Sequence, residues 1–358
     1  MKTRAWLLLA LAATTAVPAI VLTQRSEYPI TVVARGKGPY TFPDGYQTPW
    51  DRIEIMVTEK LSPNLFVLHG SEGLDPAHPD GSGGRALALF GSDGVLMVDS
   101  ENRQVGEKTL KAIRSFTNAP IKVLVNSHIH SDHTGANAFF AQQGAVIFSQ
   151  DNLRNEMLHP PLRANGQPGP AAEMAGVPTA VYAYDPNAPG RPAVTLTMNG
   201  ETVDFIPMMP SHTAGDTIVR FRTANVIYIE DFYRNFGYPF ADQANGGSVS
   251  GMLDAIDLIQ KIAGADTTLV PGHGTLVKKG DLAPYRAMLV DILAKVKTLR
   301  AQGKSLTEVL AANLTAPYDR TILGDTQQSK DRFITEAFDE VKDFPPVVDG
   351  KRTMPRRP

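Results

Sequence analysis

The sequence contains no cysteine among its 358 residues, which excludes disulfide bonds, a thiolate nucleophile and thiolate metal ligands. Any metal site must therefore use histidine, aspartate or glutamate. The chain also lacks an excess of charge, because 35 lysines and arginines oppose 37 aspartates and glutamates. A net charge of −2 provides no field that would attract nucleic acid or an anionic membrane surface. We therefore expect a small-molecule substrate and no nucleic acid, and the oligomeric state stays open.

The N-terminal residues 1–19 have the pattern of a secretory signal peptide. Lys2 and Arg4 supply a positive start, and an apolar run over residues 6–16 leads into small residues. The alternative is a membrane anchor, although the apolar stretch is at the short limit for a span. We expect cleavage near Ile20, a periplasmic or secreted location, and no stable membrane span in the mature protein.

The rest of the chain is typical of a globular protein, with 42% hydrophobic and 20% charged residues. We divide it into an N-terminal arm (20–60), a catalytic domain (61–280), a helical extension packed on that domain (281–345) and a tail (346–358). Apolar runs with strand spacing alternate with helical spacing in the first half of the domain, which predicts a layered α/β fold. Expected strands are 65–69, 85–90, 95–99, 121–126, 145–148, 194–198, 202–206, 217–221, 226–229 and 267–270; expected helices are 105–116, 135–143, 249–263, 282–301, 305–313 and 329–342. Residues 159–192 hold eight prolines and predict a long irregular loop.

The most informative segment is 127–135, Ser-His-Ile-His-Ser-Asp-His-Thr-Gly. His128, His130, Asp132 and His133 fall within six residues, although the whole chain has only eight histidines. The segment follows an expected strand and precedes an expected helix, so its side chains converge on one point. Imidazole and carboxylate ligands suit zinc, and they also admit iron or manganese.

Three further candidate ligands occur later, each where an expected strand ends. His212 lies in a Ser-His-Thr-Ala-Gly-Asp segment, Asp231 ends an apolar run, and His273 stands between two glycines. Because α/β folds place their sites at the carboxyl ends of strands, these residues are expected to join the histidine loop.

In order and spacing, these elements resemble the metallo-β-lactamase superfamily over about residues 60–275, in the form of its exported bacterial members. The resemblance implies a four-layer αββα sandwich with extra C-terminal helices and two zinc ions per chain. It also implies that His128, His130 and His212 bind the first ion, that Asp132, His133 and His273 bind the second, and that Asp231 bridges both.

The same resemblance suggests residues around the metals. Asp132 is expected to orient the nucleophile as well as bind metal, and Asp99 is expected to orient a ligand from behind. Arg234 occupies an offset where related β-lactamases often have a lysine that binds the substrate carboxylate. Tyr233 and Asn245 are further substrate-binding candidates, in a loop that leads to a helix N-terminus, which attracts anions.

These features predict an exported zinc-dependent hydrolase in which a metal-bridged hydroxide attacks a carbonyl group. A β-lactam is the best single expectation for the substrate, although secreted β-lactamases of similar layout usually have cysteine at the position of Asp231. Thioester or lactone hydrolysis, as in glyoxalase II, stays open. A di-iron redox protein and a non-catalytic metal-binding protein are the remaining alternatives.

Overall fold

The computed structural model describes residues 48–72, 79–161, 167, 169, 171–235, 237–322 and 326–343. The expected signal peptide, most of the expected arm and the tail 346–358 lie outside these residues. Among the described helices, none combines the length and apolarity that a membrane span requires.

The first sheet has seven strands in the same order as in the chain, antiparallel from β1 to β4 and parallel from β4 to β7. Its strands are β1 (Ile53–Ser62), β2 (Leu65–Glu72), β3 (Ala86–Gly91), β4 (Gly94–Val98), β5 (Ile121–Val125), β6 (Val146–Gln150) and β7 (Ala180–Tyr182). Because β1 pairs along its length with β2, the sheet begins inside the segment 20–60 that the sequence analysis assigns to an arm. Strand β1 is thus part of the first sheet, and the bounds of the catalytic domain stay a prediction.

The second sheet has six strands in the order β13-β12-β11-β10-β9-β8. They are β8 (Val194–Met198), β9 (Glu201–Pro207), β10 (Thr217–Phe221), β11 (Val226–Glu230), β12 (Thr268–Pro271) and β13 (Val277–Lys278). Only the β11–β12 pair is parallel, and the remaining pairs are antiparallel. The alternating side chains of β9, such as Val203 and Phe205, point toward the first sheet, whereas Ile206 points away from it.

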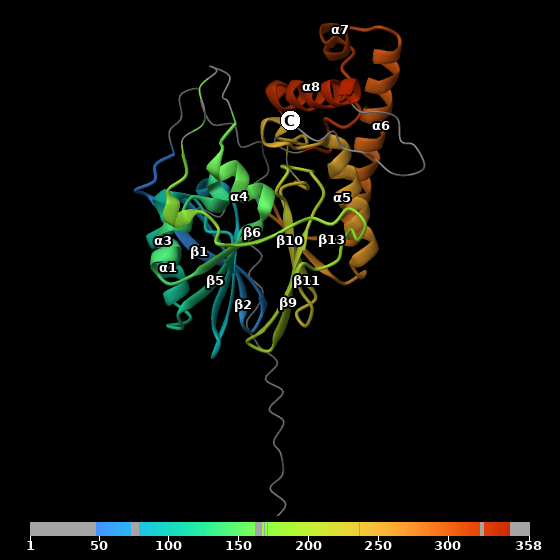
Figure 1. Ribbon diagram of the computed structural model, residues 1–358. Helices are drawn as coiled ribbons and strands as arrows, with labels where there is room; N and C mark the ends of the chain where they lie inside the picture. Colours follow the sequence, from blue (N-terminus) through green and yellow to red (C-terminus); the bar gives the residue numbers. More distant parts are fainter. Residues whose placement is uncertain are drawn as a thin grey trace, which may run out of the picture.

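The two sheets pack face to face, and helices cover their outer faces (Figure 1). Leu65, Leu96, Phe205 and Tyr228 belong to the apolar layer between the sheets. On the first sheet lie α1 (Gly106–Arg114) and α3 (Asn137–Gln142); on the second lie α5 (Val249–Ile262) and α6 (Leu282–Ala301). The layers are helix, sheet, sheet, helix, so the expected αββα architecture is confirmed.

The C-terminal helices extend the second outer layer. They are α6, α7 (Leu306–Ala311) and α8 (Gln327–Asp343), and one apolar cluster joins them to α5. Ser305 and Glu308 form the capping box that begins α7. Two remaining helices are short: α2 (Ser131–Thr134) lies in the histidine loop, and α4 (Asp151–Leu158) precedes the proline-rich segment.

Strand ends gather the predicted site residues at one edge of the sandwich. Asp99 follows β4, the histidine loop follows β5, Asp231 follows β11, and His273 comes two residues after β12. His212 lies in the turn between β9 and β10. Because β10 is antiparallel to both β9 and β11, these two strands run in the same direction, and the end of β9 lies at the same edge as the end of β11.

Candidate metal centre

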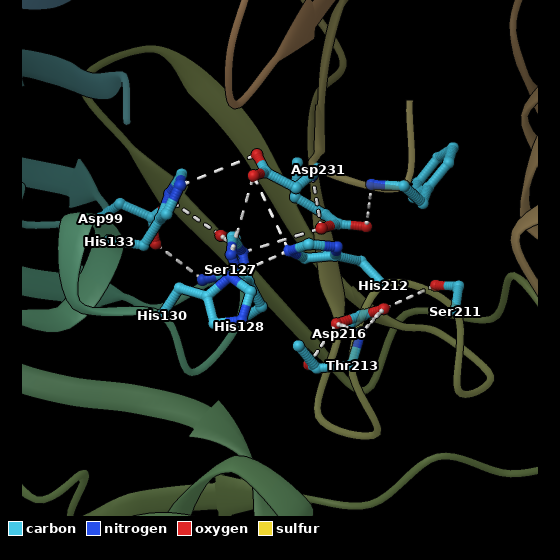
Figure 2. Close-up of polar contacts among 12 residues, drawn as sticks. Asp99, Ser127, His128, His130, His133, Ser211, His212, Thr213, Asp216 and Asp231 are labelled. Carbon is cyan, nitrogen blue, oxygen red and sulfur yellow. Dashed lines mark hydrogen bonds and ion pairs between the residues drawn. The ribbon is translucent and has the colours of Figure 1, made fainter. Parts of the chain in front are cut away.

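The structure brings together all seven residues expected to bind metal. The nitrogens of His128, His130 and His212, which we call the first half of the centre, lie within 4.8 Å of one another. The ligand atoms of Asp132, His133 and His273, the second half, meet the same limit. Figure 2 shows the imidazoles of the histidine loop turned toward His212 and Asp231.

Asp231 lies between the two halves. Its Oδ2 is 3.7 Å from His212 Nε2 and 4.0 Å from His128 Nε2, both in the first half. The same oxygen is 3.2 Å from His273 Nε2, while Oδ1 is 3.7 Å from His133 Nε2. One carboxylate therefore reaches both halves, as a bridging ligand must.

Three atoms of this cluster test whether the residues suit a metal ion. His128 Nε2, His133 Nε2 and Asp231 Oδ1 are buried and have no hydrogen-bond partner. A buried polar atom left without a partner costs about 1–3 kcal/mol, so three of them at one point require an explanation. Nitrogen and carboxylate oxygen are the atoms that zinc prefers, and a cation would satisfy all three. The residues fit a metal centre, and metal binding itself stays a prediction.

The two halves differ in charge. Burial lowers the pKa of His128 well below its ordinary value and lowers the pKa of His212 to about 3, so both imidazoles are neutral. Burial also opposes protonation of His133 and His273, but the carboxylates of Asp132 and Asp231 outweigh it and raise their pKa to about 9 and about 10. Without metal, the protons on His133 and His273 therefore neutralise the carboxylates of Asp132 and Asp231. A bound cation would replace these protons.

Asp99 supports the second half from behind, as the sequence predicts. Its Oδ2 accepts a hydrogen bond from His133 Nδ1 at 2.8 Å and another from the Tyr228 hydroxyl at 2.9 Å. Ser127 donates to the same carboxylate twice, from its amide to Oδ1 at 2.7 Å and from its hydroxyl to Oδ2 at 2.6 Å. The bond to Nδ1 leaves His133 Nε2 facing the centre, which is the usual way a protein orients a metal-binding histidine. Tyr228 gave no signal in the sequence beyond its place in an apolar strand.

The first half is supported by the loop of residues 237–248, between β11 and α5. Asp242 Oδ2 lies 2.8 Å from His130 Nε2, which leaves His130 Nδ1 facing His212 at 3.0 Å. Burial opposes ionisation of Asp242, but its hydrogen bonds with His130 and Asn245 lower its pKa to about 2. The carbonyl of Phe240 lies 2.7 Å from His212 Nδ1. The sequence analysis missed Asp242 and Phe240, because their contacts join segments more than 25 residues apart.

The turn that carries His212 is closed by Asp216. Its carboxylate accepts hydrogen bonds from the Ser211 hydroxyl at 2.6 Å and from the Thr213 amide at 3.0 Å (Figure 2). Ser211 therefore acts as a structural donor and is not placed as a nucleophile.

Two glycines allow the backbone to approach the centre closely. A methyl group on Gly272 would collide with Asp231 Oδ1 and lie 3.0 Å from His133 Cε1. A methyl group on Gly84 would lie 2.6 Å from His133 Nε2. Both positions must lack a side chain for the imidazole and the carboxylate to lie where they do.

The family model of the metallo-beta-lactamase superfamily matches residues 80–273, more than half of the chain. The chain belongs to the metallo-beta-lactamase superfamily. Its members are generally hydrolytic, so the chain has a hydrolase fold with a cluster of histidines and aspartates able to bind metal.

Solved structures share this fold at low sequence identity. A metallo-beta-lactamase from Pontibacter korlensis is 16% identical with a TM-score of 0.50, and the match covers 67% of this chain and 99% of that one. The stereoselective inverting sec-alkylsulfatase Pisa1 from Pseudomonas sp. is also 16% identical, with a TM-score of 0.57. That match covers 78% of this chain and 49% of the sulfatase, so this chain spans about half the length of that enzyme. A comparison with curated proteins found no significant sequence match.

The three expected substrate-binding residues of this superfamily member have different surroundings. Tyr233 is buried in the core, where its ring packs edge-to-face on Tyr285 with centroids 4.9 Å apart, and burial raises its pKa to about 12. Tyr233 therefore packs against α6 in the core, and its role in substrate binding stays a prediction. Arg234 lies at the centre, with Nη2 3.4 Å from Asp231 Oδ2. Asn245 donates to Asp242 Oδ2 at 2.7 Å.

A pocket of about 600 Å³ opens beside the first half of the centre. Ser131 and Asp242 line it where it adjoins the ligands, and Asn245 is also in its wall. The accessible surface of the wall is mostly apolar and includes Ile129, Ala138, Met157, Pro160, Pro161, Ala171 and Ala172, while Arg103, Glu156 and Glu173 are charged residues in the same wall. Pockets that hold small molecules typically have volumes of about 300–1,000 Å³. The proline-rich segment thus contributes to the neighbourhood of the site.

Proposed function

We propose that this protein is a hydrolase that acts on a small anionic molecule at a centre of two zinc ions. The observation that carries the proposal is the convergence of three buried, unpartnered ligand atoms, on His128, His133 and Asp231, in a hydrolase fold. A non-catalytic metal-binding protein would not need a pocket beside an open cluster, and this chain has one.

Two divalent ions, when bound, supply a water nucleophile at neutral pH and polarise the bond that it attacks. The chain's own residues make that arrangement possible. Asp231 spans the two halves, Asp99 fixes the ring of His133, and Asp242 fixes the ring of His130. Asp132, whose Oδ2 lies 3.0 Å from His273 Nε2, also faces the second half and is our candidate for orienting the nucleophile.

The substrate class follows from the surroundings of the cluster. The pocket is mostly apolar, so it favours a substrate with an apolar body. Arg234 places a guanidinium beside the bridging carboxylate, where it can pair with an anionic group through two hydrogen bonds. A β-lactam has both features, a strained amide beside a carboxylate, and is our first candidate.

A sec-alkyl sulfate ester is our second candidate. It combines an apolar chain with an anionic sulfate, which suits the same pocket and the same arginine. The fold likeness to the sec-alkylsulfatase extends over 78% of this chain, more than the 67% shared with the Pontibacter protein. Neutral lactones and thioesters remain alternatives that make no use of Arg234.

A panel of substrates on the zinc-loaded protein tests the proposal. We expect hydrolysis of at least one anionic class, either β-lactams or sec-alkyl sulfates, and loss of that activity on chelation with recovery on adding zinc. Arg234→Gln should raise KM for the anionic substrate by about tenfold or more, and by more than for neutral lactones and thioesters, because a hydrogen bond to a charged group contributes about 1.5–3 kcal/mol. Full turnover by protein that elemental analysis shows to be free of metal would refute the mechanism.

We also propose that the protein is exported to the periplasm or secreted. The support is the charged, apolar and small residues of positions 1–19. N-terminal sequencing of protein from fractionated cells of its natural host should give a start near Ile20, and an intact Met1 in the cytosol would refute export.

A further inference from the structure

Helix α8 (Gln327–Asp343) lies outside the residues that match the superfamily, yet it contacts the loop that supports the first half of the centre. The contacts come from one side of the helix and use Arg332, Glu336 and Glu340. Glu336 and Glu340 are 6% and 5% exposed, so they are committed to these contacts.

Glu340 occupies the N-terminus of α5. Its carboxylate accepts hydrogen bonds from the Ser248 hydroxyl at 2.9 Å and from the amides of Val249 at 2.6 Å and Ser250 at 2.9 Å. The sequence analysis expected this helix start to attract an anion from the substrate. The chain's own carboxylate takes that place, and it fixes the end of the 237–248 loop.

Glu336 and Arg332 hold the middle of the same loop. The amide of Ala241 donates to Glu336 Oε2 at 3.0 Å, and the Gln243 side chain donates to the Glu336 carbonyl at 2.9 Å. The guanidinium of Arg332 lies 4.2 Å from the centroid of the Phe240 ring, a cation–π contact. Three consecutive parts of the loop are therefore tied to one helix.

The tied residues are the ones that position two metal-binding histidines. Phe240 stacks on His130 with centroids 5.7 Å apart and an angle of 13° between the rings, and its carbonyl pairs with His212. Ala241 lies between Phe240 and Asp242, the hydrogen-bond partner of His130. Movement of Ala241 would thus displace both supports together.

We infer that α8 positions the first half of the metal centre, with Glu336 and Glu340 as positioning residues that act through the 237–248 loop. The inference rests on the proposed metal site but not on the identity of the substrate. It makes the C-terminal extension part of the catalytic apparatus, because the loop that orients His130 and His212 is itself held by a helix outside the matched residues.

The test compares four variants of the full-length protein. Glu336→Ala removes the acceptor of the Ala241 amide, whereas Glu336→Gln keeps one. Glu340→Gln keeps the size of the side chain but leaves one acceptor oxygen for three donors. Asp339→Ala is the control, since Asp339 is exposed on the same helix. Zinc titration in the presence of a competing chelator, the absorption spectrum of the cobalt-substituted protein and amide hydrogen exchange of the metal-free protein are measured for each.

We expect Glu336→Ala and Glu340→Gln to weaken binding of the first ion by about tenfold, the lower end for residues that orient metal ligands. The cobalt spectrum should change, and exchange in residues 237–248 should quicken without metal. Glu336→Gln should recover most of the loss, and Asp339→Ala should match the wild type. Variants that retain the wild-type zinc affinity, spectrum and exchange would overturn the inference, even if they melt at lower temperature. Wild-type protein that binds no zinc would instead refute the proposed function, and unchanged exchange in the metal-free variants would still overturn the inference.

Discussion

His133 in the second half of the centre and His130 in the first are each oriented by a carboxylate, but the two carboxylates are held differently. Asp99 directly follows β4, and its amide donates to the Val125 carbonyl at 2.9 Å in the neighbouring strand β5. Asp242 lies in a loop outside both sheets. Its amide donates to the His212 carbonyl at 2.8 Å, and the neighbouring amide of Ala241 donates to Glu336 of α8 at 3.0 Å. The second half is therefore fixed by the central sheet, whereas the first half depends on contacts with the β9–β10 turn and with a peripheral helix.

This difference suggests how the superfamily fold can be adapted. In the second half, the position of Asp99 cannot be changed without disturbing strands β4 and β5. The loop-held half adjoins the pocket through Asp242 and Asn245, so changes in the loop or in α8 alter the substrate side of the centre first. Substrate preference and first-ion affinity should consequently vary together among variants of α8.

The largest expected effect comes from removing the residue that both halves share. Asp231→Ala should reduce the metal content from about two ions toward one and lower activity by orders of magnitude, because a carboxylate that reaches both ions is lost. Metal analysis and kinetics measure both results. Glu230→Gln is the matched comparison and should cost far less, because Glu230 accepts from the Phe232 amide at 3.1 Å and lies behind His128, 3.6 Å from its Nδ1, rather than among the candidate ligands. Two tightly bound ions and normal rates in Asp231→Ala would show that the bridge is assigned to the wrong residue.

Gly272→Ala should act more selectively. The added methyl group would displace Asp231 and His133, so we expect loss of the second ion before the first and a fall in activity of at least about tenfold, in line with overpacking costs of about 1–3 kcal/mol. Gly280→Ala is the control, since a methyl group there meets no atom within 4 Å. Stepwise zinc titration distinguishes the ions. Equal weakening of both ions would contradict the view that the halves are independently held.

A paired comparison of Asp99→Asn and Asp242→Asn tests the two supports directly. Asp99 accepts four hydrogen bonds, so asparagine leaves several donors unsatisfied, and we expect about a 10–100-fold loss of affinity for the second ion. Asp242 is partly exposed and is carried by a loop that can adjust, so its variant should lose about tenfold, at the first ion. Zinc titration should show that each variant leaves the affinity for the other ion unchanged. If Asp99→Asn weakened the first ion and Asp242→Asn the second, the assignment of the two supports would be wrong.

The sequence analysis was most successful where a short motif contains the chemistry. The histidine loop, His212, Asp231 and His273 were identified because each follows a strand signal, and strand ends converge in layered α/β folds. The helix 282–301 was predicted with the bounds that the structure gives, since its apolar spacing is uninterrupted and Gly303 follows it.

Other features depend on contacts that no local pattern encodes. The segment of β1 suggests an arm because its charged residues Glu54, Glu59 and Lys60 obscure the strand alternation. Glu59 pairs with a residue that is distant in the sequence, since its Oε1 lies 3.2 Å from Arg85 Nη1. The packing of Tyr233 on Tyr285 joins residues about 50 positions apart, and no pattern near Tyr233 indicates it. The carboxylates Glu336 and Glu340 belong to an amphipathic helix, where glutamate ordinarily indicates a solvated face. Their partners lie more than 90 residues away.

The smallest expected effect is the pH dependence of metal binding, which should differ between the two halves because their histidines differ in protonation. At pH 7 His128 and His212 are neutral, whereas the carboxylates keep His133 and His273 protonated through pKa values of about 9 and about 10. Because a metal ligand must be deprotonated, binding of the second ion should release about two protons from His133 and His273, whereas His128 and His212 release none at the first ion. Zinc affinity of the second half should therefore rise as pH increases toward 9, and more steeply than that of the first half. The metal-free protein should behave in the opposite sense. Protonated His133 and His273 contribute stability that is fully present below their unfolded pKa of about 6.5 and is lost as pH rises through 9 to 10.

Calorimetric titration in two buffers of different ionisation enthalpy counts the protons, and thermal unfolding with and without zinc measures the stability. His273→Gln should remove about one of the two protons, and equal proton release at both ions would show that the two halves do not differ in charge.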